Sequence, residues 1–319
     1  MVRLSASKIK SFLTCSYQAW LSYYAGHPRT SNEGSQRGDI THRILECLAH
    51  PKRKETVNKI LFAQNAFCYP PIERMVRLAA KHHELDGEDH VEMINSFLLN
   101  ALNDDFHKVG SVERFIEREF EIKNDDYWIY GFIDQLIVYP DRIKIVDFKS
   151  SKKKWAPSSD DVLWNIQALM YALVASKWYP NMPCEVEFLF VKFNKRNKIT
   201  LSFTQEQLNG FEAYLKYFSD YLSDFGVEKA HGNFAKHSIK TKFFCGADSV
   251  TFKKDDGTHK WVCPSKFPFI YFLLVDEYGR QIKSSRKKED FLLDIQHNPQ
   301  YNVIEKEYSG CPVWAHLWK

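Results

Sequence analysis

Two acidic residues and a lysine fall on two short apolar segments of the sequence that a turn separates. The first segment contains Gly131-Phe-Ile-Asp134, and the second contains Asp147-Phe-Lys149. Successive side chains of a β-strand point to opposite faces, so Asp147 and Lys149 share a face, and a hairpin brings Asp134 alongside them. Two carboxylates at such a distance repel each other unless a cation lies between them. The pattern therefore predicts a site for a hard divalent ion with oxygen ligands, Mg²⁺ or Mn²⁺.

Such a site suits the hydrolysis of a phosphodiester bond. Mg²⁺ or Mn²⁺ can activate a water molecule and neutralise the charge that builds up on a phosphoryl oxygen. The Lys149 ammonium can orient that water or stabilise the transition state from a rigid strand. The same spacing equally fits a surface hairpin with a salt bridge between Asp147 and Lys149, so spacing alone leaves both interpretations open.

The elements that must position these residues follow from the periodicity of the apolar residues. Residues 128–138 and 143–148 are expected to form adjacent strands of a hairpin or meander. A helix over about 160–177 and a strand over 186–193 come next, and this order favours a parallel strand pair with a right-handed crossover. Residues 199–224 add a further strand and a long helix to the same core.

Helices dominate the expected structure before the first of these strands. Apolar residues at steps of three and four predict an amphipathic helix over residues 5–24 and a second helix that begins near Asp39 and ends before Pro51. Residues 52–108 also have a helical pattern, which we interpret as an insertion. The periodicity weakens beyond Gly226, where an apolar strand, a turn and a short helix are expected.

These pieces together resemble the PD-(D/E)xK nuclease superfamily. The resemblance is to the subgroup of RecB-like exonucleases, which includes the CRISPR adaptation nucleases, the AddB nuclease domain and the mitochondrial genome-maintenance exonuclease. Five segments carry it, in the right order over residues 4–193: residues 4–15 as the opening helix, Gly38 and His42 of the Gly-x-x-x-His motif, Glu117-Arg-Glu119 as the acidic strand, the set of Asp134, Asp147 and Lys149, and Gln167-Ala-Leu-Met-Tyr171 as the QxxxY motif.

The resemblance implies an α/β fold with a restriction-endonuclease-like core, in which helices flank a mixed central sheet. We expect this nuclease core over residues 1–225, with the helical insertion at about 50–110. Residues 226–319 are expected to form a C-terminal α+β module that contains cysteines and packs on the core.

The resemblance also assigns roles to individual residues. It implies that Asp134, Asp147, Lys149, Gln167 and Tyr171 are catalytic, and that His42, Asp134 and Asp147 hold the metal ion. Gln167 and Tyr171 are four residues apart and share one face of a helix. Two further acids are interpreted either as groups that support the ligands or as ordinary surface acids: Glu46 and Glu119.

Many relatives in this subgroup hold a [4Fe-4S] cluster with one cysteine of the first helix and three near the C-terminus. The resemblance offers Cys15, Cys245, Cys263 and Cys311 for this role, and four thiolates satisfy such a cluster. The last three lie 18 and 48 residues apart rather than close together. The alternative is that they are small buried apolar residues, as cysteines commonly are.

The formal net charge of +4 does not by itself identify a nucleic-acid-binding protein. The distribution of basic residues is more informative, because Lys152, Lys153 and Lys154 precede Trp155 directly after the predicted metal site. Lysines can contact phosphates while the indole stacks on a base, so this segment and the basic run over 280–288 are the expected DNA contacts.

The sequence thus predicts a metal-dependent DNA nuclease, an exonuclease that prefers single strands and acts in repair, recombination or replication. An endonuclease, or a nuclease that works with a helicase or recombination partner, uses the same site, and the sequence lacks the Walker A signature of ATP-driven unwinding. A non-catalytic DNA-binding protein has no need of the two acids and the lysine. No apolar run is long enough to cross a membrane, and an odd number of cysteines with basic residues at positions 8 and 10 favours the cytoplasm.

Overall fold

A computed structural model of the protein describes residues 1–29, 33–102, 106–107, 113–150, 165–195, 197–246 and 262–318. The chain divides into two compact units, which are described separately below. The first unit consists of Met1–Ala6 and Ser31–Ser219, and the second consists of Ser7–Thr30 and Asp220–Lys319. The expected domain boundary near residue 225 lies close to the start of the last of these segments. Residues Ser7–Thr30, however, group with the C-terminal part of the chain rather than with the nuclease core.

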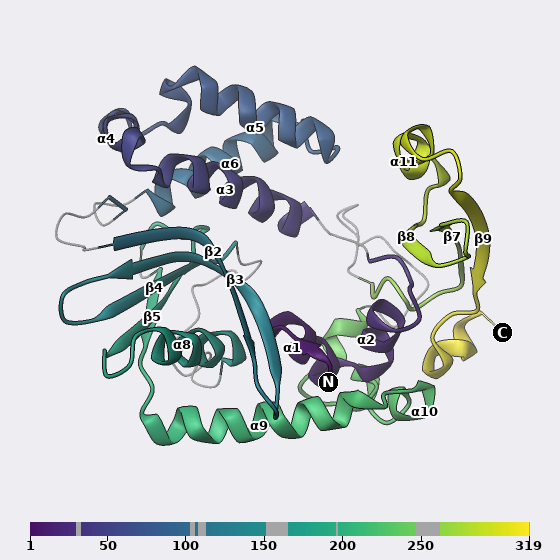
Figure 1. Ribbon diagram of the computed structural model, residues 1–319. Helices are drawn as coiled ribbons and strands as arrows, with labels where there is room; N and C mark the ends of the chain where they lie inside the picture. The colour runs from purple at the N-terminus through teal and green to yellow at the C-terminus, as the bar shows by residue number, and fades with distance from the viewer. Residues whose placement is uncertain are drawn as a thin grey trace. The chain divides into compact units, whose positions relative to one another are not determined.

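The first unit is built on a six-stranded mixed sheet, as the sequence predicts (Figure 1). Its strands are β1 (Arg3–Leu4), β2 (Glu113–Lys123), β3 (Trp128–Val138), β4 (Ile143–Phe148), β5 (Cys184–Leu189) and β6 (Lys198–Leu201). Strand β3 pairs along one edge with β2 in antiparallel fashion. Its other edge carries β1 in parallel near its start and β4 in antiparallel fashion near its end. Strand β3 therefore pairs directly with three other strands of the sheet.

The second half of this sheet follows the expected strand–helix–strand order. Strands β4 and β5 are parallel, and helix α8 (Ile166–Trp178) connects them. Nine of the thirteen residues of α8 are buried, which makes it an almost wholly apolar helix packed into the core. Strand β6 adds to β5 in antiparallel fashion and precedes the long helix α9 (Gln205–Ser223).

Helices fill the region that the sequence assigns to an insertion. They are α3 (Glu33–Ala49), α4 (Lys54–Ala63), α5 (Pro70–His82) and α6 (Glu88–Ala101), with short 3₁₀ turns η1 (Pro51–Arg53) and η2 (Ala66–Cys68) between them. Their apolar faces share one core with Ile137 of β3, Val146 and Phe148 of β4, and Leu189 of β5. Because side chains alternate along a strand, Asp134 and Asp147 belong to the opposite face of the sheet.

Helix α3 begins at Glu33, six residues before the position that the apolar periodicity predicts. The extra segment contains Gly34 and Gly38. Glycine has a low helix propensity, so the sequence does not predict that the helix extends over this segment. Both glycines are buried. A Cβ atom on Gly38 would lie 2.5 Å from Oγ of Ser150. The glycine therefore permits the close approach of α3 to the end of β4.

The second unit contains a small antiparallel sheet and several short helices. Strands β7 (Phe269–Val275), β8 (Gln281–Ser285) and β9 (Asn302–Tyr308) form the sheet in the order β8-β7-β9. Its other elements are α1 (Ala6–Thr14), α2 (Ser16–Tyr23), α10 (Val227–Ala230), η3 (Ala235–His237), η4 (Lys242–Cys245), η5 (Lys288–Phe291), α11 (Leu292–His297) and η6 (Pro312–Leu317).

The single helix expected over residues 5–24 is two helices. Cys15 separates them with an extended backbone (φ −159°), and it occupies the N-cap position of α2. The Ser16 amide donates to the Asn233 carbonyl at 2.8 Å, a tertiary bond that replaces a helical one. Apolar periodicity continues through the break, so the sequence pattern does not reveal it. In the part of the chain that the structure describes, no helix is long and apolar enough to span a membrane.

Candidate active site

Three acidic residues lie in a row across the adjacent strands β2, β3 and β4. The β2–β3 register pairs Ile116 with Gln135 and Arg118 with Ile133, which sets Glu117 opposite Asp134. The last partners of β3 and β4 at this end are Gln135 and Val146. One residue further along each strand, Asp134 lies opposite Asp147. Glu117 has a left-handed backbone (φ +46°), an unfavourable conformation for a residue with a Cβ atom. Backbone strain is thus located at one of the three acids.

The Asp134 side chain continues the hydrogen bonding between β3 and β4 beyond the last paired residues of the two strands. The Phe148 amide donates to the Asp134 side chain, at 2.8 Å from Oδ2, rather than to a backbone carbonyl of β3. On the other side of β4 the pairing with β5 continues, since the Lys149 amide donates to the Leu189 carbonyl at 2.8 Å. The backbone around Asp147 is therefore fixed from both sides, and Asp147 is only 1% exposed. This burial contradicts the alternative of a surface hairpin.

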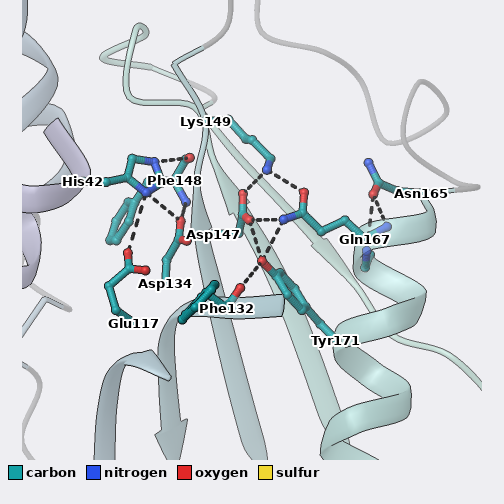
Figure 2. Close-up of polar contacts among 11 residues, drawn as sticks. His42, Glu117, Phe132, Asp134, Asp147, Phe148, Lys149, Asn165, Gln167 and Tyr171 are labelled. Carbon is teal, nitrogen blue, oxygen red and sulfur yellow. Dashed lines mark hydrogen bonds and ion pairs between the residues drawn. The ribbon is translucent and has the colours of Figure 1, made fainter. Parts of the chain in front are cut away.

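Asp147 is the centre of a network that includes the other predicted catalytic residues (Figure 2). Its Oδ2 lies 2.5 Å from Nζ of Lys149. The Gln167 side-chain amide donates to Asp147 Oδ1 at 2.9 Å and accepts from Lys149 Nζ at 2.7 Å. The Tyr171 hydroxyl contacts Asp147 Oδ1 at 3.2 Å and the Phe132 carbonyl at 2.8 Å. The lysine and the two residues of helix α8 thus hold one carboxylate in a fixed orientation.

Helix α8 is placed by contacts at its start and along its length. The Asn165 side chain caps the helix and accepts from the amides of Gln167 and Ala168, which fixes the turn that carries Gln167. Further along, the rings of Tyr171 and Phe120 meet edge to face with centroids 6.2 Å apart. A Cβ atom on Gly131 would lie 2.6 Å from the Phe120 ring, so the glycine of the Gly-x-x-Asp segment makes room for that ring.

His42 reaches the acidic row from helix α3, on the side opposite to α8 (Figure 2). Its Nε2 lies 2.9 Å from the Phe148 carbonyl oxygen, which can only accept, so this nitrogen donates. Its Nδ1 then faces the acids, at 3.4 Å from Asp134 and 3.9 Å from Glu117. The hydrogen bond on one ring nitrogen selects the other as the ligand atom, which is a common arrangement around protein metal sites.

Ligand atoms of His42, Glu117 and Asp134 all lie within 4.8 Å of one another, close enough to hold one metal ion. The electrostatics favour a cation at this point. Burial and the charge of Asp147 raise the pKa of the Asp134 carboxyl to about 7. Burial lowers the pKa of His42, but Glu117, Asp134 and Asp147 outweigh it and raise that pKa to about 9. Asp147 Oδ2 is buried and takes no well-directed hydrogen bond from the described residues. Such a crowded group of oxygens fits a divalent cation.

The structure brings together the five predicted catalytic residues and His42. The further acid of strand β2 that lies beside them is Glu117 and not Glu119. Glu117 lies next to His42, whereas Glu119 is exposed and lies 4.0 Å from Arg3. The sequence alone names Glu119 as the further acid because it does not give the β2–β3 register. That register sets Glu117 opposite Asp134 and Glu119 opposite Phe132. Glu46 lines an open hollow next to the acids. The predicted DNA contacts Lys152, Lys153, Lys154 and Trp155 lie outside the described residues.

Four cysteines of the second unit line a common hollow of about 300 Å³, although they come from widely separated segments. They are Cys15, Cys245, Cys263 and Cys311. The Cys263 amide donates to the Cys245 carbonyl at 3.1 Å, and Gly246 bridges to Val262. Cys245 and Cys263 therefore lie next to each other in space although they are 18 residues apart in the sequence, as the cluster hypothesis requires. We refer to this feature as the four-cysteine hollow.

Two cysteines of this hollow, Cys245 and Cys311, are buried, and Cys15 and Cys263 are half-buried. Burial raises the pKa of the Cys263 thiol to about 12, and the neighbouring Cys15 and Cys245 add to the effect. Burial likewise raises the pKa of Cys311 to about 12. Within the described ranges, no three of these sulfurs lie within 4.8 Å of one another.

One comparison with known proteins gives a match over most of the chain. The family model described as the PD-(D/E)XK nuclease superfamily matches residues 3–246. Among solved structures, the chain is similar to a crystal structure of a candidate exonuclease from Eubacterium rectale, with 9% sequence identity and a TM-score of 0.46. That similarity covers 75% of this chain and 87% of the other. No curated protein matches the sequence.

Proposed function

The chain belongs to the PD-(D/E)XK nuclease superfamily, and we propose that it is a divalent-metal-dependent exonuclease that prefers single-stranded DNA. The observation that carries the proposal is the row of Glu117, Asp134 and Asp147, completed by His42 from one side and Lys149 from the other. A protein that only binds DNA has no need to bury carboxylates against one another, because that arrangement costs free energy without a cation.

The residues fit Mg²⁺ or Mn²⁺ in a specific way. His42 Nδ1 and the carboxylates of Glu117 and Asp134 would hold the ion. We keep Asp147, which the resemblance also names as a ligand, as a fourth candidate because it is buried and its charge raises the pKa of Asp134. When bound there, the cation supplies Lewis acidity: it favours deprotonation of a water and offsets charge on the phosphate. Because the ligands come from a sheet and a helix that share one core, the site is held in place before substrate arrives.

The side chains around Asp147 have separate tasks in this proposal. Lys149 is within reach of the water and of the scissile phosphate, where an ammonium stabilises the negative charge of the transition state. Gln167 holds Lys149 and Asp147 at once, at 2.7 and 2.9 Å, and so keeps the ammonium from moving towards solvent. Tyr171 contacts Asp147 and the backbone of β3 and is a positioning residue.

The same site also serves an endonuclease or a nuclease that depends on a helicase or recombination partner. The sequence has no Walker A signature, so unwinding of a duplex would have to come from another chain. We propose the cytosol as the place of reaction, since seven cysteines without disulfides suit a reducing compartment.

The deciding experiment follows the degradation of linear single-stranded DNA, labelled at either end, and of closed circular DNA in the presence of Mg²⁺ or Mn²⁺. The wild type is compared with Asp147→Asn and Lys149→Ala. Progressive loss from one end in the wild type alone supports the exonuclease and gives its polarity. Cleavage of the circle would replace it with an endonuclease. Binding without any cleavage of DNA would overturn the catalytic proposal.

We further propose that Cys15, Cys245, Cys263 and Cys311 hold a [4Fe-4S] cluster. The support is that all four line one hollow and that a backbone hydrogen bond joins Cys263 to Cys245. A cluster with four thiolate ligands would join the segment between α1 and α2 to the C-terminal part of the second unit. Visible absorption and about four irons per chain in anaerobically purified protein would support this. Colourless protein without iron would refute it.

A further inference from the structure

A second open hollow lies directly beside the candidate active site and is formed by the helical insertion. The hollow at the active site has a volume of about 580 Å³ and is bordered by His42, Glu117 and Lys149. The neighbouring hollow has a volume of about 740 Å³ and is bordered by residues of α3, η1 and the start of α5. Glu46 lines both of them. A chain that occupies the first hollow can therefore continue into the second.

Helix α3 gives the direction of this path. His42 and Glu46 are four residues apart in α3, which places them on one face of the helix. Four residues of an α-helix correspond to about 6 Å along its axis. The second hollow thus begins one helical turn beyond the metal-ligand group, on the same face of α3. We call it the Tyr69 hollow.

The side chains of the Tyr69 hollow combine three properties. The first is positive charge, since Lys52 and Arg53 are exposed on η1 and the acid at its edge is Glu46. The second is an aromatic ring, Tyr69, whose hydroxyl accepts a hydrogen bond from Arg53 at 3.0 Å. The third is an apolar surface, to which Met75 contributes with 39% exposure.

This combination matches the chemistry of a single nucleic-acid strand. The bases of a single strand are exposed and stack on aromatic side chains, and the phosphates pair with nearby basic groups. The Arg53 guanidinium lies over the Tyr69 ring, with Cζ 6.0 Å from the ring centroid. A strand that stacks a base on this ring therefore brings the adjoining phosphate close to Arg53. A duplex presents no free base face to such a ring, so the chemistry favours a single strand.

We propose that the Tyr69 hollow is a nucleotide subsite of the DNA strand, next to the active site, in which a base stacks on Tyr69 and the adjoining phosphate pairs with Arg53 and Lys52. The proposal rests on the proposed DNA nuclease function and adds a specificity-determining surface to it. The helical insertion is then a part of the substrate-binding machinery, and it selects for strands long enough to reach beyond the scissile bond.

The test compares a long substrate with a minimal one. Tyr69→Leu combined with Arg53→Ala removes the ring and the guanidinium but keeps an apolar residue where Tyr69 packs on the helical core. We expect the KM for a single-stranded 20-mer to rise about tenfold, with kcat within about twofold, because stacking and one phosphate contact are lost. Hydrolysis of bis(4-nitrophenyl) phosphate, which reaches only the metal site, should not change.

Control variants separate this role from a loss of stability. Lys59→Ala removes an exposed positive charge from α4 that does not border the Tyr69 hollow, and its KM should stay that of the wild type. Tyr69→Phe retains the ring and should retain affinity within about twofold. Arg53→Ala alone should lower the slope of log affinity against log salt by about 0.7, which is the share of one phosphate contact on a single strand.

Binding measured by fluorescence anisotropy distinguishes this proposal from the nuclease proposal. Unchanged affinity and KM in the double variant, with hydrolysis of bis(4-nitrophenyl) phosphate intact, would overturn the subsite and leave the nuclease standing. That result would assign the hollow to another occupant, such as an acidic segment of a partner protein. A wild type that binds the 20-mer without cleavage, and loses affinity in the double variant, would support the subsite and overturn the catalysis. No binding by the wild type would overturn both.

Discussion

The carboxylate site of Glu117, Asp134 and Asp147 takes its acids from three neighbouring strands, whereas the four-cysteine hollow collects residues from widely separated segments. The acids come from one meander of β-strands within residues 113–148. The cysteines come from the α1–α2 junction, the end of η4, the residue after the bridging Val262 and the start of η6. The first site is fixed by sheet register, whereas the second is assembled from helix ends and a bridge.

The two sites differ in what holds their ligands in place before a metal binds. In the carboxylate site the backbone is hydrogen-bonded on both sides of Asp147, so the ligands are in place without a cation. In the four-cysteine hollow the backbone is also hydrogen-bonded, for example from the Cys311 amide to the Lys266 carbonyl. Burial, however, raises the pKa of the Cys263 and Cys311 thiols to about 12, so these ligands stay neutral without a metal. A bound metal should therefore change activity at the first site and stability at the second.

The largest effect is expected from Asp147→Asn, which keeps the shape of the side chain and removes its charge. Metal-assisted stabilisation of transition-state charge is worth several kcal/mol, so cleavage of single-stranded DNA should fall about a thousandfold. The melting temperature should not fall, because the change also relieves repulsion with Asp134. Asp141→Asn, at an acid whose side chain is 72% exposed, is the control and should leave both quantities unchanged.

Cys263→Ser should have the opposite signature. We expect loss of iron and of visible absorption, together with a lower melting temperature, since 1 kcal/mol lost corresponds to about 3–6 °C in a unit of this size. Mg²⁺ affinity at the carboxylate site should stay unchanged. Cys47→Ser, an exposed cysteine of the first unit, is the control. If Cys263→Ser keeps its iron and its melting temperature, the distinction between the two sites fails.

Glu117→Gln and Glu119→Gln form a matched pair on one strand. Glu117 belongs to the metal-ligand group, and Glu119 is exposed. We expect the first change to weaken Mg²⁺ affinity at least about tenfold, in line with losses around metal sites, and the second to have no effect. Isothermal titration of the two variants checks this. Equal affinities would remove Glu117 from the site and restore the sequence-based preference for Glu119.

Tyr171→Phe should have the smallest effect of the four. It removes the hydroxyl that contacts the Phe132 carbonyl and Asp147, and loss of a buried hydrogen bond costs about 1 kcal/mol. Activity should fall by less than about tenfold, since Gln167 still holds Asp147. Tyr217→Phe, at a tyrosine that is 66% exposed, should leave stability and activity unchanged. A thousandfold loss would make Tyr171 a catalytic rather than a positioning residue.

Regular patterns along the chain indicate which side chains of the carboxylate site share a face. Strand alternation places Asp147 and Lys149 on one face, and helical periodicity does the same for Gln167 and Tyr171. Periodicity also yields the mixed sheet and the parallel pair of β4 and β5. The fold class and the superfamily are confirmed for this reason, since both depend on patterns that are regular along the chain.

The features that the sequence could not supply are departures from regularity. The pairing of β2 with β3 sets Glu117 rather than Glu119 opposite Asp134, and Glu117 has a positive φ at this point. The break at Cys15 interrupts an otherwise continuous apolar stripe because a backbone bond to Asn233 is made there. The Tyr69 hollow combines residues of three elements whose spacing carries no recognisable motif. Tertiary contacts decide each of these, and periodicity does not contain them.

The division of the chain between the two units has a consequence for synthesis in the cell. Residues Ser7–Thr30 belong with Asp220–Lys319, so about 190 residues must leave the ribosome before these helices can meet their partners. At usual rates of translation this takes roughly 10–40 s. During that time the apolar side chains of Phe12 and Leu21, buried in the finished protein, lack their final environment. The first unit can thus fold first. The helices of residues Ser7–Thr30 stay exposed to chaperones until residues Asp220–Lys319 have been synthesised.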